Sequence, residues 1–211
     1  MKNIVILISG RGSNLSALLD ANIPAHFVAV ISNRPDAAGL QYAAERGIKT
    51  VVIDHKTFVD RAVFDKSLIQ EIDSHKPHLV VLAGFMRIFT PEFVEHYYGR
   101  LINIHPSLLP SFTGLHTHEK AIAEGVKIHG CTVHFVNSTL DHGPIVVQAA
   151  VPVLKEDTPD ILAARVLKQE HIIYPKAVRW FVEGRLKLTD DGKVHLLNEL
   201  PIQDVLVSPG D

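Results

Sequence analysis

The stretch Ile4-Val5-Ile6-Leu7-Ile8-Ser9-Gly10-Arg11-Gly12-Ser13-Asn14 indicates the class of fold. Five consecutive apolar residues are typical of a strand that is buried on both faces, and the glycines that follow permit a sharp turn. A helix-like segment then continues from Asn14 to Asp20. Such a strand-turn-helix unit is typical of α/β folds with a parallel sheet.

The same alternation continues through the first half of the chain. Apolar runs predict strands, and the segments between them have helical character, with Gly47 and Pro91 as plausible helix boundaries. We therefore expect a Rossmann-like, mostly parallel central sheet with helices on both faces. Further strands are predicted at 27–31, 50–53, 79–83 and 100–104, and helices at 37–46, 61–74 and 91–96.

The pattern changes after residue 104. Longer strands are predicted at 132–136 and 145–152, followed by a long helix that begins near Asp157-Thr158-Pro159 and ends at about residue 183. Segments 185–188 and 193–196 predict a hairpin. We expect one domain over residues 1–211, with a phosphate-binding half at about 1–100, a second half at about 101–188 and an irregular tail after about 200.

Composition narrows the function classes. The chain has 211 residues, 46% hydrophobic, 21% charged and a formal net charge of -2, which fits a soluble globular enzyme. Near-neutral charge argues against nucleic acid or a membrane as partner. Cys131 is the only cysteine, so no internal disulfide can form, and the start of the chain does not resemble a signal peptide. We expect a cytoplasmic protein.

Two polar motifs predict the chemistry. Asn103-Ile104-His105-Pro106-Ser107-Leu108-Leu109-Pro110 begins at the end of a predicted buried strand, and Asp141-His142-Gly143-Pro144 comes about thirty residues later. Strand alternation places Asn103 and His105 on one face. An amide, an imidazole and a carboxylate are the groups needed to form and collapse a tetrahedral carbonyl adduct, which indicates an acyl-transfer site. As alternatives, His105 could be a structural core residue, Asn103 could bond a loop and Asp141 could serve only the turn.

The glycine turn predicts a phosphate site. Free N–H groups at a helix N-terminus attract anions, although a turn without a ligand uses the same glycines. The turn lacks the third glycine of a dinucleotide fingerprint and the lysine of a Walker loop, which disfavours NAD and ATP.

These motifs resemble those of the folate-dependent formyltransferases. The pattern N-x-H-x-S-L-L-P matches residues 103–110 without a gap, and L-D-x-G-P matches residues 140–144. Within that superfamily the chain is most similar to the phosphoribosylglycinamide formyltransferase family, through residues 10–14, 84–88 and 169–171. The similarity extends from about residue 3 to about residue 188.

The resemblance implies a reaction. A formyl group would pass from 10-formyltetrahydrofolate, a co-substrate, to the amine of glycinamide ribonucleotide in purine biosynthesis, without a metal. His105 would move the proton, Asn103 would stabilise the oxyanion, and Asp141 would favour the imidazolium form of His105 and position water. The protein would be a monomer or a homodimer that binds small molecules only.

The resemblance also implies binding residues, in two groups. The substrate would contact Gly12, Ser13, Asn14, Pro106, Lys168, Gln169 and Glu170. The folate would contact Arg61, Met86, Arg87, Ile88, Phe89, Asn103, Asn137, Ser138, Thr139, Leu140 and Asp141.

Other interpretations remain at this point. Methionyl-tRNA formyltransferase and formyltetrahydrofolate deformylase share the trio, but each carries an added domain for which we expect no room here. A non-catalytic nucleotide-binding module could use the glycine turn alone. A zinc site would require His116 and His118 on one face of an extended segment, without the usual ligand spacing. Ser111 and Ser138 depart from the family pattern and leave nearby substrate contacts open.

Overall fold

A seven-stranded mixed sheet forms the centre of the molecule in the computed structural model, which describes residues 1–199. Its strand order is β3-β2-β1-β4-β5-β6-β7, with parallel pairing from β3 through β5 and antiparallel pairing of β5 with β6 and of β6 with β7. The expected α/β fold is confirmed, and the tail expected after about residue 200 lies outside the described residues. The strands are β1 (Lys2–Ile8), β2 (Ala25–Ser32), β3 (Lys49–Val52), β4 (Leu79–Leu82), β5 (Leu101–His105), β6 (Ile128–Phe135) and β7 (Ile145–Pro152).

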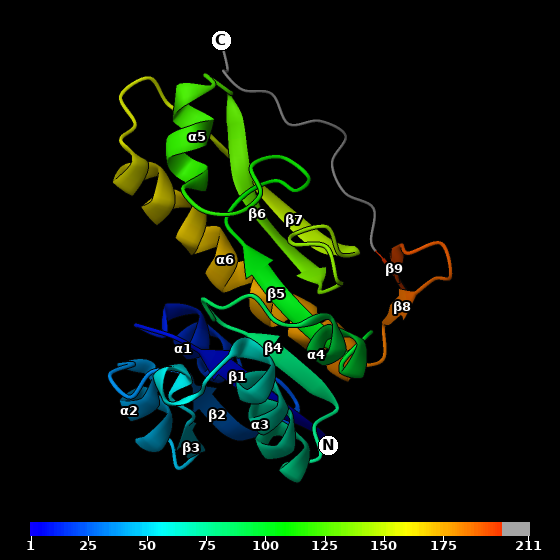
Figure 1. Ribbon diagram of the computed structural model, residues 1–211. Helices are drawn as coiled ribbons and strands as arrows, with labels where there is room; N and C mark the ends of the chain where they lie inside the picture. Colours follow the sequence, from blue (N-terminus) through cyan, green and yellow to red (C-terminus); the bar gives the residue numbers. More distant parts are fainter. Residues whose placement is uncertain (200–211) are drawn as a thin grey trace.

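Helices cover both faces of this sheet (Figure 1). One buried cluster joins strand residues such as Ile4 and Ile102 to α1, α2, α5 and α6, and the other joins residues such as Val5 and Leu101 to α3 and α4. The side chains of each buried strand therefore alternate between two cores. The helices are α1 (Ser13–Asp20), α2 (Gly39–Ala44), α3 (Arg61–Ser74), α4 (Pro91–His96), α5 (Thr117–Ala123) and α6 (Pro159–Val182), with a short 3-10 helix η1 (His55–Thr57).

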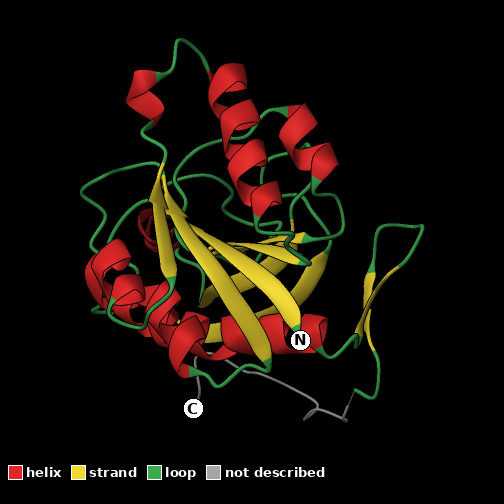
Figure 2. Ribbon diagram, turned by 90° about the horizontal axis from the view of Figure 1, so that it is seen from below, coloured by secondary structure: helices red, strands yellow, loops and turns green. Residues whose placement is uncertain are grey.

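Local signals account for the accuracy of the predicted elements. The predicted bounds of α3 and α4 are correct because Asp60 and Thr90 cap their first turns through side-chain oxygens. The prediction for α2 was too long, because Ala37 lies in a turn and Gly47, at φ 69°, follows the helix end. The prediction for β6 began too late. The predicted hairpin is confirmed as β8 (Leu186–Leu188) and β9 (Val194–Leu196), which stands apart from the body in Figure 2.

None of the helices within residues 1–199 combines the length and apolar character that crossing a membrane requires.

Tyr174 ties the long helix α6 to the centre of the sheet. Its side chain is completely buried, and its hydroxyl lies 2.8 Å from Leu82 O in β4 and 3.2 Å from Ile102 O in β5. The hydroxyl proton can be donated to either carbonyl, so the buried oxygen has a hydrogen-bond partner. The contact therefore fixes α6 against the central strands β4 and β5.

We predict that Tyr174→Phe lowers the free energy of unfolding by about 1 kcal/mol, because a buried hydrogen bond is lost while the ring remains. Urea unfolding followed by circular dichroism measures this change. Tyr98→Phe is the matched control, because Tyr98 is 52% exposed and should tolerate the change. Equal stability of Tyr174→Phe and wild type would contradict the assigned role of the hydroxyl.

Candidate active site

The pairing of β5 with β6 places polar side chains opposite each other. Asn103 lies opposite His134, and His105 lies opposite Thr132. The neighbouring residues Ile102 and Ile104 belong to the core beneath α6. Asn103 and His105 therefore share the other face of β5, as strand alternation predicted.

His105 is buried and is held at both ring nitrogens. Its Nε2 lies 3.0 Å from the backbone oxygen of Phe112, and its Nδ1 lies 3.6 Å from Asp141 Oδ2. A carbonyl oxygen can only accept a hydrogen bond, so Nε2 carries the proton in the neutral ring. The basic nitrogen of neutral His105 is then Nδ1, which faces the carboxylate.

Asp141 occupies a strained turn between β6 and β7. Its φ is 55°, in the left-handed region, and its Oδ2 accepts a hydrogen bond of 2.8 Å from Gly114 N–H. The following Gly143 leaves no space for a side chain, since a Cβ there would lie 1.7 Å from Phe135 O. The turn therefore delivers the Asp141 side chain, which is only 8% exposed, against His105.

Asn103 donates to His134 across the sheet. Asn103 Nδ2 lies 3.3 Å from His134 Nε2, while His134 Nδ1 donates to Phe135 O at 2.9 Å. Burial lowers the pKa of His134, which keeps the ring neutral and leaves Nε2 as an acceptor. One Asn103 amide hydrogen is thereby used, and the second remains available to another acceptor.

Two further histidines pack together near the site. His129 Nε2 lies 3.2 Å from His118 Nδ1, and burial lowers the pKa of His129 to about 4. His116 has φ 59° and precedes α5, where His118 lies, so the extended segment that the zinc alternative required is wrong. Within residues 1–199, no three His, Cys, Asp or Glu side chains form a group suited to a metal.

Burial raises the pKa of the Cys131 thiol to about 12, which agrees with a packing role.

The glycine turn leads into α1, as predicted. Gly12 precedes the helix with φ 81°, and a Cβ there would lie 2.8 Å from Gly39 Cα, so the backbone alone requires glycine at this position. The first N–H groups of α1 have no acceptor within the helix. They face the end of the sheet where β1 and β4 also end, which is the usual place for a ligand in an open α/β sheet.

Glu170 of α6 reaches the glycine turn. Its Oε2 accepts a hydrogen bond of 2.8 Å from Asn14 Nδ2, and both side chains are buried. Burial raises the pKa of Glu170, while the bond from Asn14 opposes that shift. A second buried atom here, Asn14 Oδ1, has no partner. A buried carboxyl beside an unsatisfied amide oxygen is unfavourable for stability, and such groups are common at functional sites.

Apart from Arg61 in α3 and Asn103 in β5, the residues predicted to bind folate lie in two segments, 86–89 and 137–141. In the first, Phe85 and Phe89 are buried and stack on each other, while Met86 and Ile88 are 69% and 56% exposed. Arg87 lies over the Phe64 ring, with its buried Nε unpaired. The second segment, 137–141, carries Asp141 itself, and Asn137 Oδ1 accepts from Thr139 N–H at 3.0 Å. Phe89 therefore packs inward, whereas Met86 and Ile88 face outward.

Three of the residues predicted to bind a substrate have less structural support for that role. Arg61 is exposed as the first residue of α3, and Lys168 is exposed on α6 beside the half-buried Gln169. Pro106 contributes its carbonyl, which accepts from Thr117 Oγ1 at 2.7 Å. Among residues 1–199, no hydrogen bond or ion pair joins the side chain of Arg61 or Lys168 to His105 or Asp141, and Pro106 is the residue that follows His105.

Sequence reasoning missed several members of the site. The ring of His134 and the carbonyl of Phe112 hold Asn103 and His105, and the N–H of Gly114 holds Asp141. The alternation of polar Thr132 and His134 in an apolar strand was the available signal for His134. No side-chain pattern could have identified the two backbone groups.

Comparison with known proteins gives a consistent result. A family model described as formyl transferase matches residues 2–178. The Escherichia coli (strain K12) phosphoribosylglycinamide formyltransferase is 52% identical over 90% of this chain and 91% of its own. A glycinamide ribonucleotide transformylase 1 from Symbiobacterium toebii aligns with TM-score 0.91 and 44% identity, covering 94% of this chain and 95% of that chain. A phosphoribosylglycinamide formyltransferase from Coxiella burnetii aligns with TM-score 0.89 and 48% identity, covering 92% and 93%.

The buried carboxyl of Glu170 leads to a prediction about stability and pH. Its pKa in the folded protein is raised, so its contribution is fully present below the unfolded value of about 4.3 and is lost as pH rises through the folded value. Glu170→Gln keeps an acceptor for Asn14 but carries no charge. The unfolding free energy of this variant relative to wild type should therefore increase as pH rises from about 4.3 toward neutrality.

Urea unfolding at a series of pH values measures this difference. Glu124→Gln is the control, because Glu124 is exposed after the end of α5. A difference between Glu170→Gln and wild type that stays constant with pH would show that burial does not penalise the Glu170 carboxylate.

Proposed function

Because the chain belongs to the formyl transferase family, we propose that it transfers a formyl group from 10-formyltetrahydrofolate to the amine of glycinamide ribonucleotide, in purine biosynthesis. The products would be the N-formyl ribonucleotide and tetrahydrofolate. The single, buried cysteine fits a reducing, cytoplasmic setting. The relatives named above support both the reaction and its substrates.

The observation that carries the chemical proposal is the buried His105–Asp141 pair beside Asn103. An acyl transfer needs one group that accepts a proton from the attacking amine and another that stabilises the negative oxygen. His105 Nδ1 is a free base in the neutral ring and faces a carboxylate. Asn103 retains one amide hydrogen on the same face of β5. The two needs are therefore met by adjacent side chains.

The proposed reaction proceeds through a tetrahedral adduct. The amine nitrogen attacks the formyl carbon, and the carbonyl electrons move to oxygen, where the Asn103 amide donates a hydrogen bond. The amine proton passes to His105 Nδ1, directly or through water, and Asp141 stabilises the resulting imidazolium. When the adduct collapses, the bond from carbon to the folate nitrogen breaks. The same proton then reaches that leaving nitrogen, so the reaction requires no external acid or base.

The two substrates would approach from opposite sides of this group. We propose that the ribonucleotide phosphate binds the N–H groups of Gly12, Ser13 and Asn14, where the helix dipole of α1 favours an anion. Glu170 and the free Oδ1 of Asn14 would accept hydrogen bonds from polar groups of the same substrate. The folate would lie against segments 86–89 and 137–141. We assign the first half of the domain to phosphate binding and the second half to catalysis.

The direct test is an assay of formyl transfer with purified wild-type protein, 10-formyltetrahydrofolate and glycinamide ribonucleotide. We expect stoichiometric formation of tetrahydrofolate and the N-formyl product. A non-catalytic nucleotide-binding module would bind the ribonucleotide without turnover. Absence of product with both substrates bound would overturn the proposed function.

The trio Asn103, His105 and Asp141 should behave as one unit. We predict that His105→Ala and Asn103→Ala each lower kcat by about a hundredfold or more, because one loses proton transfer and the other loses an oxyanion donor. Asp141→Asn should lower kcat comparably. The double variant Asn103→Ala with His105→Ala should lose far less than the product of the two single losses.

Steady-state kinetics of the single and double variants measure this coupling, with circular dichroism to confirm folding. Thr57→Ala is a suitable control, because its hydroxyl contacts only the exposed η1 backbone at Asp54 O. A folded His105→Ala protein with wild-type turnover would rule out the proposed role of the imidazole.

A further inference from the structure

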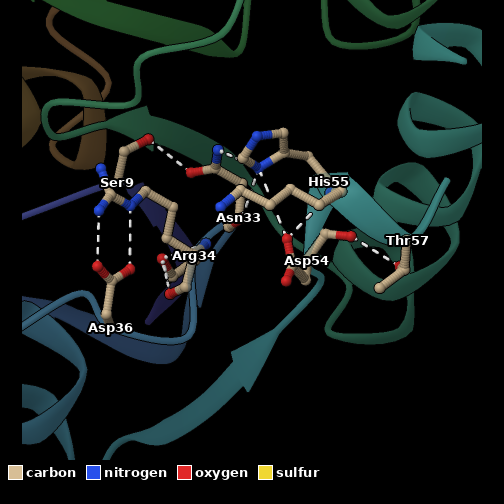
Figure 3. Close-up of polar contacts among 9 residues, drawn as sticks. Ser9, Asn33, Arg34, Asp36, Asp54, His55 and Thr57 are labelled. Carbon is tan, nitrogen blue, oxygen red and sulfur yellow. Dashed lines mark hydrogen bonds and ion pairs between the residues drawn. The ribbon is translucent and has the colours of Figure 1, made fainter.

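A polar network outside the catalytic trio ends on the first folate segment. Ser9 follows β1, and its Oγ accepts a hydrogen bond of 2.8 Å from Met86 N–H. The same hydroxyl donates to Asn33 Oδ1 at 2.6 Å, and both side chains are buried. Asn33 follows β2, so the network extends from the end of β2 to the segment after β4. Figure 3 shows the Ser9 hydroxyl directed at the Asn33 amide.

Ser9 continues the β1–β4 ladder after the backbone of β4 has turned away. The last backbone contacts of this ladder are Ala83 N to Leu7 O at 2.9 Å and Ser9 N to Gly84 O at 3.2 Å. Gly84 has φ 77°, which directs the chain out of the strand. The side-chain oxygen of Ser9 then replaces a backbone carbonyl as the acceptor for Met86 N–H. This hydrogen bond sets where the exposed Met86-Arg87-Ile88 stretch begins.

Asn33 determines the polarity of the Ser9 hydroxyl. A hydroxyl has one proton, and Ser9 donates it in the hydrogen bond to Asn33 Oδ1. The oxygen of Ser9 therefore faces Met86 N–H as an acceptor. His55 holds Asn33 in turn, because its Nδ1 lies 2.8 Å from Asn33 O and 3.1 Å from Asn33 Nδ2. Either ring tautomer satisfies one of these contacts.

The other end of the segment is anchored by a buried carboxylate. Asp65 of α3 is 2% exposed, and its Oδ2 accepts a hydrogen bond of 2.6 Å from Thr90 N–H. The stacked rings of Phe85 and Phe89, on either side of residues 86–88, hold the segment against the core. The backbone of residues 86–90 is thus held at both ends before any ligand arrives, which is the condition for pre-organised binding.

We propose that Ser9 and Asn33 are positioning residues for the folate, acting through the backbone of Met86-Arg87-Ile88. This proposal rests on the proposed function, because it assigns the 86–89 segment to the folate. Neither side chain has to touch the folate, since the Met86 amide transmits their effect. Their loss should therefore weaken folate use and leave the ribonucleotide site at Gly12 and Glu170 intact.

The experiment compares Ser9→Ala with Ser32→Ala. Ser32 is a buried serine that precedes Asn33, and its Oγ donates to Arg34 O and accepts from Arg34 N, so it makes two similar bonds without contacting segment 84–90. Ser9→Ala should raise the KM for 10-formyltetrahydrofolate about tenfold. The KM for the ribonucleotide and kcat should stay within about twofold. Ser32→Ala should leave all three parameters within about twofold, whatever its effect on thermal stability.

A double-mutant cycle tests whether Asn33 acts through Ser9. Asn33→Ala should raise the folate KM in the wild-type background and add nothing in the Ser9→Ala background. Additive effects would overturn the assigned order of the network. A proportional rise in both KM values, or an unchanged folate KM in Ser9→Ala, would overturn the positioning role.

Hydrogen exchange separates this proposal from the proposed function. In protein without ligands, Ser9→Ala should accelerate exchange of the Met86 amide, and Ser32→Ala should not. Unchanged exchange would contradict the proposal even if the enzyme is a formyltransferase. Lack of formyl transfer by wild type would contradict the proposed function, and accelerated exchange at Met86 would still support the network's hold on the segment.

Discussion

The antiparallel pairing of β5 with β6 is the contact on which the site depends. Without β6, β5 would be the last strand of the parallel sheet, and Asn103 and His105 would lie on an unpaired edge strand. The added strand β6 covers that edge, places His134 opposite Asn103 and leads into the turn that carries Asp141. The change from parallel to antiparallel pairing therefore brings an amide, an imidazole and a carboxylate together in one region of the sheet.

Backbone carbonyls assign different tasks to similar side chains in this group. The Phe112 carbonyl accepts a hydrogen bond from Nε2 of His105, so Nδ1 faces the carboxylate. The Phe135 carbonyl accepts a hydrogen bond from Nδ1 of His134, so Nε2 can accept from Asn103. Burial lowers the pKa values of His118, His129 and His134. Of the four rings of His105, His118, His129 and His134, only that of His105 has a carboxylate within 4 Å among the described residues. The Asp141 carboxylate therefore distinguishes the surroundings of His105 from those of the other three rings.

The sequence allowed the elements with local signals to be predicted. The bounds of α3 and α4 follow from the caps at Asp60 and Thr90. The trio was proposed from two short motifs, of which the first begins within β5 and the second follows β6. Contacts across the sheet were not accessible, because nothing in the sequence sets the register that pairs Asn103 with His134. α5 was not predicted, because the residue before it, His116, is in a left-handed conformation and forms no side-chain cap that would indicate a helix start. The acceptor for Met86 N–H could not be predicted either, because in the sequence Ser9 is only the residue after a predicted strand.

A crystal structure with glycinamide ribonucleotide and a folate bound together would show whether one end of the sheet holds both substrates around His105. We expect the phosphate on the N–H groups of Gly12, Ser13 and Asn14. The substrate amine should lie within about 3 Å of the His105 ring or of one water bound to that ring. The Asn103 amide should point at the position of the formyl oxygen. A phosphate bound elsewhere, or an amine separated from His105 by the folate, would contradict the account.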